Sequence, residues 1–172
     1  MRTTPIRMSH LALAQMVGML ELDGKWFLPE CGRSAKNFLK ARGEWEKAGL
    51  AELNFDGELQ LAPRMARLAY NMTHARRALL YEEGENKTLL LKGPVDVLAL
   101  KYIPEEESWD LALRPFHETA KWLRELRAES SSGRLLTLEA GEGEPVCRAL
   151  TDKDTGKEEE NHAGSSDGND PI

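Results

Sequence analysis

Three consecutive apolar segments between residues 77 and 102 constrain the fold more than any other part of the chain. They read RALLYEE, KTLLLKG and VDVLALKY, and the turns between them contain Gly84-Glu85-Asn86 and Gly93-Pro94. Short apolar or alternating runs bounded by turn residues are typical of strands. Strands joined by tight turns pair antiparallel. The sequence therefore predicts a three-stranded antiparallel meander.

Two helices are expected before this meander. Residues 9–22 repeat apolar side chains at helical spacing, with Ser9 as a suitable N-cap. A second helix is expected over residues 34–49, with Ser34 as its N-cap and Trp45 close to its apolar face. Both helices are amphipathic, so each is expected to bury one face.

A β-ribbon is expected at AELNFDGELQLA, residues 51–62, where Asp56-Gly57 is a strong hairpin signal. A two-residue turn would pair Leu53 with Gln60 and put Leu59 on the opposite face. A three-residue turn pairs Leu53 with Leu59 and makes one face apolar throughout. A slip of one residue moves every side chain of a strand to the opposite face of the ribbon. The hydrophobic pattern therefore favours the longer turn, with Gly57 in the left-handed conformation. We expect the apolar face of this ribbon to pack on a core.

A helix is expected to start at Pro63, and the longest helical pattern covers residues 104–129 (PEEESWDLALRPFHETAKWLRELRAE). In that pattern Ser108 is a possible N-cap, and Pro115 either kinks the helix or starts its main part. RLLTLEA and PVCRALT add a further hairpin. The predicted fold class is α+β: N-terminal helices with a β-ribbon, and a mostly antiparallel sheet packed by a long C-terminal helix.

The charge of the chain is unevenly distributed. Residues 152–172 hold seven acids and two lysines, whereas the other 151 residues hold 22 acids and 21 bases. We expect 152–172 to be a disordered acidic tail. Residues 1–151 are expected to form a single α+β domain, with a helical and ribbon part at 9–75 and the sheet with the long helix at 76–151.

No catalytic motif is visible. His117 opens a helix segment that resembles a zinc-protease motif, but Lys121 stands where the second histidine would be required. The chain has no nucleophile motif, phosphate-binding loop or dinucleotide fingerprint, and Cys31 and Cys147 lack a visible base. We therefore expect a non-enzymatic protein without cofactor or metal. The absence of a signal peptide or a long apolar run favours a cytoplasmic location without membrane contact.

Trp45 and Trp122 are the candidate protein-contact residues. Both lie on expected helices, near their apolar stripes but not strictly on them. They are interpreted either as residues at the edge of the core or as anchors for a partner protein, since partly exposed tryptophan is enriched at binding hot spots.

A helix followed by a ribbon is also how a winged-helix DNA-binding domain ends. In this chain, however, Asp56 and Glu58 lie at the ribbon tip, where a wing would approach phosphates. The strongest basic cluster comes after the ribbon and comprises Arg64, Arg67, Arg76 and Arg77. A protein partner is therefore favoured and nucleic acid is not expected. A winged-helix-like transcriptional regulator is the alternative.

The order of the segments resembles a known family. EKAGL is followed by AELNFDGELQLAPRMARLA and then by RRALLYEEG, which opens the meander. Over residues 9–150 this layout resembles the cytoplasmic adaptors and chaperones of type VII secretion, the EspG-type proteins and their Firmicute counterparts. The resemblance implies a non-enzymatic chaperone that holds a helical secretion substrate in the cytoplasm with its sheet and adjoining loops. It assigns no individual binding residue, partner or oligomeric state.

Overall fold

The computed structural model describes residues 4–30, 32, 34–129, 133–139 and 146–149. The predicted acidic tail lies outside these residues. The elements in chain order are β1 (Ile6–Ser9), α1 (His10–Met19), α2 (Ala35–Lys47), β2 (Ala51–Leu53), β3 (Leu59–Leu61), α3 (Pro63–Thr73), β4 (Arg77–Glu83), β5 (Asn86–Lys92), β6 (Val97–Ile103), η1 (Pro104–Glu106), β7 (Ser108–Arg114), η2 (Phe116–Glu118), α4 (Thr119–Glu129), β8 (Arg134–Glu139) and β9 (Val146–Ala149). The structure is α+β, as the sequence predicts.

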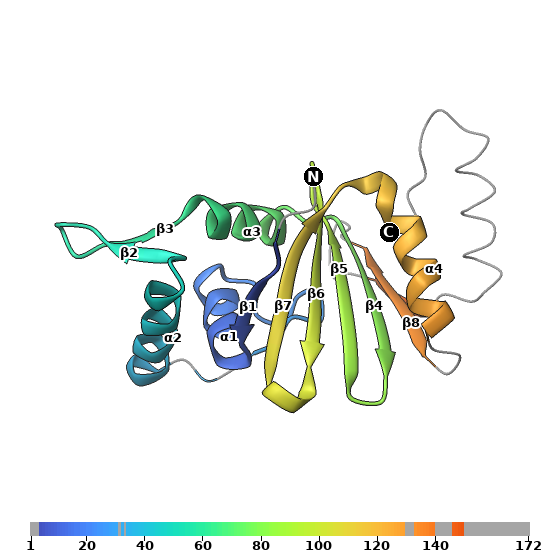
Figure 1. Ribbon diagram of the computed structural model, residues 1–172, viewed down its shortest axis with the longest axis horizontal. Coiled ribbons are helices and arrows are strands. Elements are labelled where there is room, and N and C mark those ends of the chain that lie inside the picture. Colours follow the sequence, from blue (N-terminus) through green and yellow to red (C-terminus); the bar gives the residue numbers. More distant parts are fainter. Residues whose placement is uncertain (1–3, 31, 33, 130–132, 140–145, 150–172) are drawn as a thin grey trace.

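A seven-stranded sheet forms the body of the molecule, with the strand order β1-β7-β6-β5-β4-β8-β9 (Figure 1). The pairings of these strands are all antiparallel. The predicted meander is confirmed as β4, β5 and β6, and the predicted C-terminal hairpin is confirmed as β8 and β9. β8 extends the sheet beside β4, so the last part of the chain returns to the start of the meander.

The predicted helix over residues 104–129 is wrong in its first half. Residues 108–114 form β7, and α4 begins only at Thr119. In SWDLALR the side chains of Trp109, Leu111 and Leu113 are buried at a spacing of two, which is the period of a strand. Ser108 therefore pairs with Ile103 of β6 instead of capping a helix. The long C-terminal helix is replaced by a strand and a shorter helix.

Strand β1 is a further difference from the prediction, because the four residues IRMS carry too little pattern to indicate a strand. It pairs with β7 and forms one edge of the sheet. Arg7 donates to both Glu106 and Asp110, with N–O distances of 2.7 and 2.9 Å. The hydrogen bond to Asp110 and the charge of its carboxylate raise the pKa of Arg7 above its ordinary value. These contacts join the start of the chain to the β6–β7 turn.

Three helices begin at the predicted residues. The Ser9 hydroxyl caps α1 by accepting a hydrogen bond from the backbone N–H of Ala12 at 3.1 Å. The Ser34 hydroxyl caps α2 in the same way. Pro63 is the first residue of α3, where its missing N–H leaves no helical hydrogen bond unmade. α1 ends at Met19, three residues before the predicted end.

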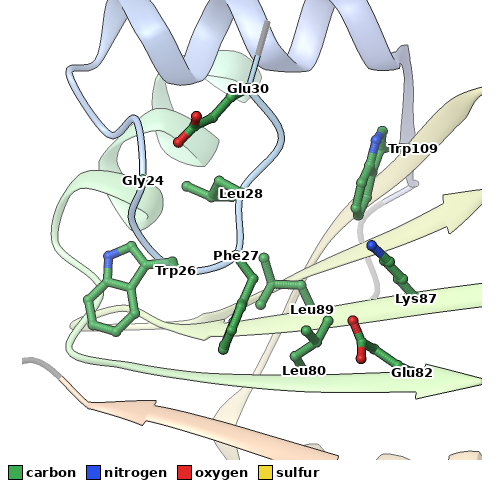
Figure 2. A pocket seen from close by; sticks show the side chains of 10 residues that line it. All are labelled: Gly24, Trp26, Phe27, Leu28, Glu30, Leu80, Glu82, Lys87, Leu89 and Trp109. Carbon is green, nitrogen blue, oxygen red and sulfur yellow. The ribbon is translucent and has the colours of Figure 1, made fainter. Parts of the chain in front are cut away.

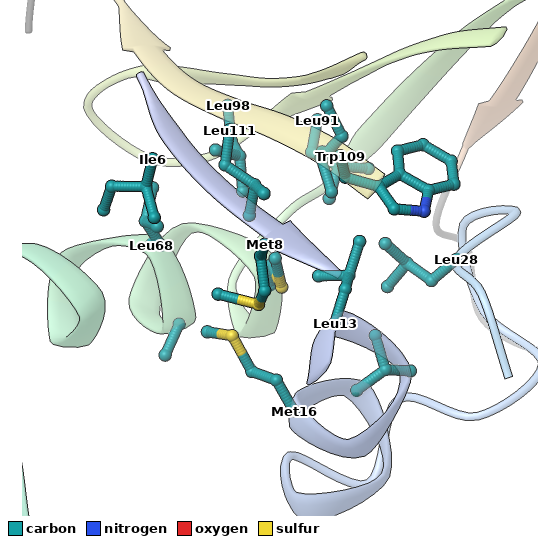
Figure 3. Close-up of a cluster of buried hydrophobic side chains, with 14 of the residues drawn as sticks. Ile6, Met8, Leu13, Met16, Leu28, Leu68, Leu91, Leu98, Trp109 and Leu111 are labelled. Atoms are coloured by element: carbon teal, nitrogen blue, oxygen red, sulfur yellow. The ribbon is translucent and has the colours of Figure 1, made fainter. Parts of the chain in front are cut away.

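The larger hydrophobic core lies on one face of the sheet (Figure 3). α1 and α3 cover this face, and α2 packs against α1. Leu13 and Met16 of α1 meet Met8, Leu98 and Leu111 from the strands, and each of these side chains is at most 1% exposed. One continuous core therefore includes residues from the N-terminal helices and from the sheet.

The opposite face of the sheet carries a smaller core, which α4 covers. Leu79, Leu90 and Ala99 of the strands pack with Leu123 of the helix. Figure 1 shows α4 at the β4–β8 end of the sheet, away from the N-terminal helices. The N-terminal helices thus cover one face of the sheet, and α4 covers part of the other.

Candidate functional site

The ribbon of β2 and β3 has the register that its hydrophobic pattern predicts. Leu53 pairs with Leu59 and Ala51 with Leu61. Gly57 has a φ of +79°, the left-handed conformation expected of it. We call residues 51–61 the arm. Figure 1 shows that the arm projects beyond α2 and α3, away from the sheet.

Burial of the side chains along the arm decreases from its base to its tip. Ala51 at the base is 6% exposed, and Leu59 and Leu61 are partly buried against the main core. Leu53 is 43% exposed, and Phe55 in the turn is fully exposed. The expectation that the apolar face of the ribbon packs on a core therefore holds at its base, whereas its outer part faces solvent.

The side chain of Asn54 accepts hydrogen bonds that fix the tip of the arm, which carries Phe55. The Asn54 Oδ1 atom accepts from the backbone N–H groups of Asp56 at 3.0 Å and Glu58 at 2.8 Å. The backbone carbonyl of Asn54 also accepts from the N–H of Gly57 at 3.0 Å. Asn54 thus replaces backbone partners in the turn, as asparagine does in tight turns. The exposed phenyl ring stands on an ordered turn.

The arm is acidic as well as apolar. Glu52, Asp56 and Glu58 are exposed, and the arm contains no lysine or arginine. Glu52 and Gln60 face each other on the side of the ribbon opposite to Leu53 and Leu59. The arm therefore offers an apolar surface bordered by negative charge, which is complementary to an apolar surface bordered by positive charge.

A hollow of about 520 Å³ lies where the arm meets the helices. Glu46 of α2 lines it, together with residues at the base of the arm and Pro63 of α3. Leu39 of α2 is 53% exposed and lies seven residues before Glu46, so both side chains share one face of the helix. This face of α2 therefore carries an exposed apolar side chain as well as an acidic one.

The candidate Trp45 does not lie on this surface. Its side chain is 0% exposed, its ring makes an edge contact with Phe38, and its indole N–H has no hydrogen-bond partner in the described part of the chain. Trp45 is a core residue of the isolated chain and cannot contact a partner in this structure. Trp45 belongs to the main core, which agrees with its interpretation as a residue at the edge of the core.

The candidate Trp122 is half-buried on α4 and packs against the smaller core. The guanidinium of Arg114 lies 4.0 Å from the centre of its ring, a cation–π contact. Trp122 therefore already has partners within the chain, and its role as a protein contact stays a prediction. Neither Trp45 nor Trp122 forms part of the arm.

Phe55 is the residue that sequence reasoning did not single out. The signal for it was present, because the three-residue turn that the register requires places a phenylalanine in the turn itself. Turn positions usually carry polar residues or glycine, since they face water. On the arm this position carries an exposed phenylalanine instead.

A second hollow, of about 590 Å³, lies between the loop after α1 and the sheet (Figure 2). Leu80 and Leu89 line it from the strands, and Phe27 extends toward them from the loop. Trp26 and Phe27 have φ values of +59° and +58°, which residues with a Cβ rarely adopt. The burial of Trp26 offsets part of this strain, because it is only 5% exposed.

The lining of this second hollow does not indicate catalysis. Its charged residues are Glu30, Glu82 and Lys87, and it contains no serine, threonine, cysteine or histidine. Among the described residues no group of three potential metal ligands comes together. Within the same residues, no helix has the length and apolar character to span a membrane.

No model of a protein family matches the chain, and no curated protein is similar enough to it to count as a relative. The geometry of the chain itself therefore carries the functional argument.

Proposed function

We propose that the protein binds another protein through the arm formed by residues 51–61 and acts as an adaptor or chaperone rather than as an enzyme. The observation that carries this proposal is Phe55, which is fully exposed on a turn fixed by Asn54. Large aromatic side chains contribute strongly to binding when a partner buries them. An ordered turn lowers the entropy lost on binding.

The charges beside Phe55 define the kind of surface that fits it. Three acids and no base on the arm favour a partner with an apolar groove or helix face bordered by lysine or arginine. The same acids disfavour a wing-like contact with phosphates, because like charges repel. We therefore prefer a protein partner to the DNA-binding alternative.

The resemblance of the segment order to type VII secretion adaptors supports a finer form of the proposal. In that form the partner is a helical secretion substrate, and the protein holds it in the cytoplasm by burying its apolar helix face. Neighbouring genes for small helical-hairpin proteins or a secretion ATPase would support this form.

Photo-crosslinking in the native host tests the proposal. A photoreactive phenylalanine analogue at position 55 is expected to give adducts of discrete mass with a second protein. The matched control carries the analogue at Glu85, which is exposed in the turn between β4 and β5, away from the arm and from α3. Adducts at both positions in similar yield, or at neither, would contradict a specific arm.

A further inference from the structure

The outer face of α3, with the turn that follows it, is the electrostatic counterpart of the arm. Residues 63–76, which cover α3 and this turn, contain three arginines and neither aspartate nor glutamate, whereas the arm contains three acids and no base. Charges in this chain are otherwise mixed, with 22 acids and 21 bases before residue 152. Two neighbouring segments of opposite sign are therefore a specific feature of this part of the molecule.

The positive charge on α3 and on the turn after it is available to a partner. Within the described residues, the exposed Arg76 side chain has no hydrogen-bond or ion-pair partner. Arg64 donates to the backbone carbonyl of Thr4 at 3.0 Å, a neutral acceptor that leaves its charge in place. Only Arg67 is matched among these three, by Asp96. Arg64 and Arg76 thus leave the face net positive.

Apolar surface accompanies these charges, as it does on the arm. Tyr70 is 49% exposed and stacks on His74, with ring centres 4.3 Å apart. Val95, in the turn after β5, is 65% exposed. The face of α3 therefore combines an aromatic ring with positive charge, and the arm combines Phe55 with negative charge.

The two surfaces also match in length. The 11 residues of α3 span about 16 Å at the usual helical rise. Five extended residues from Ala51 to the tip span roughly 16 Å as well, at the usual strand rise. In Figure 1 the arm leads away from the start of α3, so it does not lie on the outer face of its own helix.

From this complementarity we propose that the arm of one copy docks along α3 of a second copy, in a reciprocal two-fold pair. A two-fold axis repeats each contact, so both arms and both helices are used at once. This inference rests on the proposed function in that the same arm is the docking element. It adds that a second copy occupies the arm until another partner displaces it.

Charge exchange tests this pair in the purified full chain by sedimentation velocity. The wild-type protein is expected to have twice the monomer mass of 19.3 kDa. The double variant Arg64→Glu/Arg76→Glu and the double variant Glu52→Arg/Asp56→Arg are each expected to weaken dimerisation by at least about tenfold, because like charges then face each other.

Mixing the two double variants is the decisive step. In the mixed pair, the acidic arm of Arg64→Glu/Arg76→Glu meets the basic α3 face of Glu52→Arg/Asp56→Arg. The basic arm of the second variant meets the acidic α3 face of the first. Both contacts are then complementary again, so the mixture is expected to regain the dimer mass. Circular dichroism checks that each variant is folded, which is expected because Arg64, Arg76, Glu52 and Asp56 are exposed.

A matched control keeps the same change in net charge away from the contact. Lys36→Glu/Lys40→Glu alters two exposed residues of α2 and is expected to leave the dimer intact. A monomeric wild-type chain, a dimer that survives either double variant, or a mixture that stays monomeric would overturn the proposal. A salt-sensitive shift of random duplex DNA, lost in Arg64→Glu/Arg76→Glu while the wild type is monomeric, would also overturn it and assign α3 to nucleic acid.

The self-association and the proposed function fail separately. Arg64→Glu/Arg76→Glu leaves the arm unchanged, so crosslinking of another protein at position 55 is expected to persist in this variant. Loss of only the homodimer adduct supports the pair, and absence of heterologous adducts in both proteins contradicts the proposed function alone.

Discussion

The β4–β5 hairpin and the β2–β3 arm are both two-stranded units in which leucines face each other, but they end in different surroundings. In the first, Leu80 and Leu89 are paired and at most 4% exposed, because the neighbouring strands and the loop after α1 cover them. In the second, Leu53 is paired with Leu59 and is 43% exposed. The same local pattern therefore forms part of a core in one case and an open surface in the other.

This difference separates apolar residues that stabilise the fold from those that remain exposed to solvent. A two-stranded hairpin alone is only marginally stable in water. The base of the arm obtains support from Ala51 and the partly buried Leu61, whereas the tip depends on its own turn. Residues at the tip contribute little to folding, which leaves them available for contact with another molecule.

The largest expected effect contrasts the two hairpins directly. Leu89→Ala removes a side chain that is 0% exposed and is expected to lower the free energy of unfolding by roughly 2–5 kcal/mol. Leu53→Ala, its counterpart on the arm, is expected to cost less than about 1 kcal/mol because the side chain is 43% exposed and buries far less apolar area. Urea unfolding measures both, and equal losses would break the comparison.

A smaller loss is expected at Gly93, between β5 and β6. A Cβ at this position would come near the side chain of Asn71, which is 2% exposed and donates to the carbonyl of Arg67. Gly93→Ala is therefore expected to destabilise the body by about 1–3 kcal/mol, since buried side chains must shift. An unchanged unfolding midpoint would show that this part of the body is less tightly packed than the structure indicates.

The opposite sign is expected at Gly43, an exposed glycine inside α2. A Cβ there meets no atom within 4 Å, and alanine is favoured over glycine in a helix by roughly 0.5–1 kcal/mol. Gly43→Ala is expected to raise the thermal midpoint without altering association through the arm. A decrease in the midpoint would contradict the assigned helix surface.

The sequence predicted the parts of this fold whose pattern is local. The meander, the register at Leu53 and Leu59, and the helix starts at Ser9, Ser34 and Pro63 follow from spacing, caps and turn residues. Residues 108–114 were misassigned because SWDLALR fits either period when read alone. The segment forms a strand because it pairs with β1 on one side and with β6 on the other.

The candidate site could be predicted only in part for a similar physical reason. Trp45 and Phe55 are both aromatic residues near the edge of an apolar pattern. Burial divides them, and burial depends on how α2 packs against α1 and on how far the arm extends. Neither property is encoded in a single helix or hairpin, so the sequence left Trp45 open as either a core-edge residue or a partner contact and did not single out Phe55.

The most direct test of the central claim is the substitution Phe55→Ser, followed by two readouts on the same protein. Because the ring is fully exposed, the free energy of unfolding is expected to change by less than about 0.5 kcal/mol. The amount of partner protein that co-purifies from the native host is expected to fall sharply, while Glu85→Ser, in the exposed turn of the β4–β5 hairpin, leaves it unchanged. Undiminished co-purification of the partner with the Phe55→Ser protein would contradict the account.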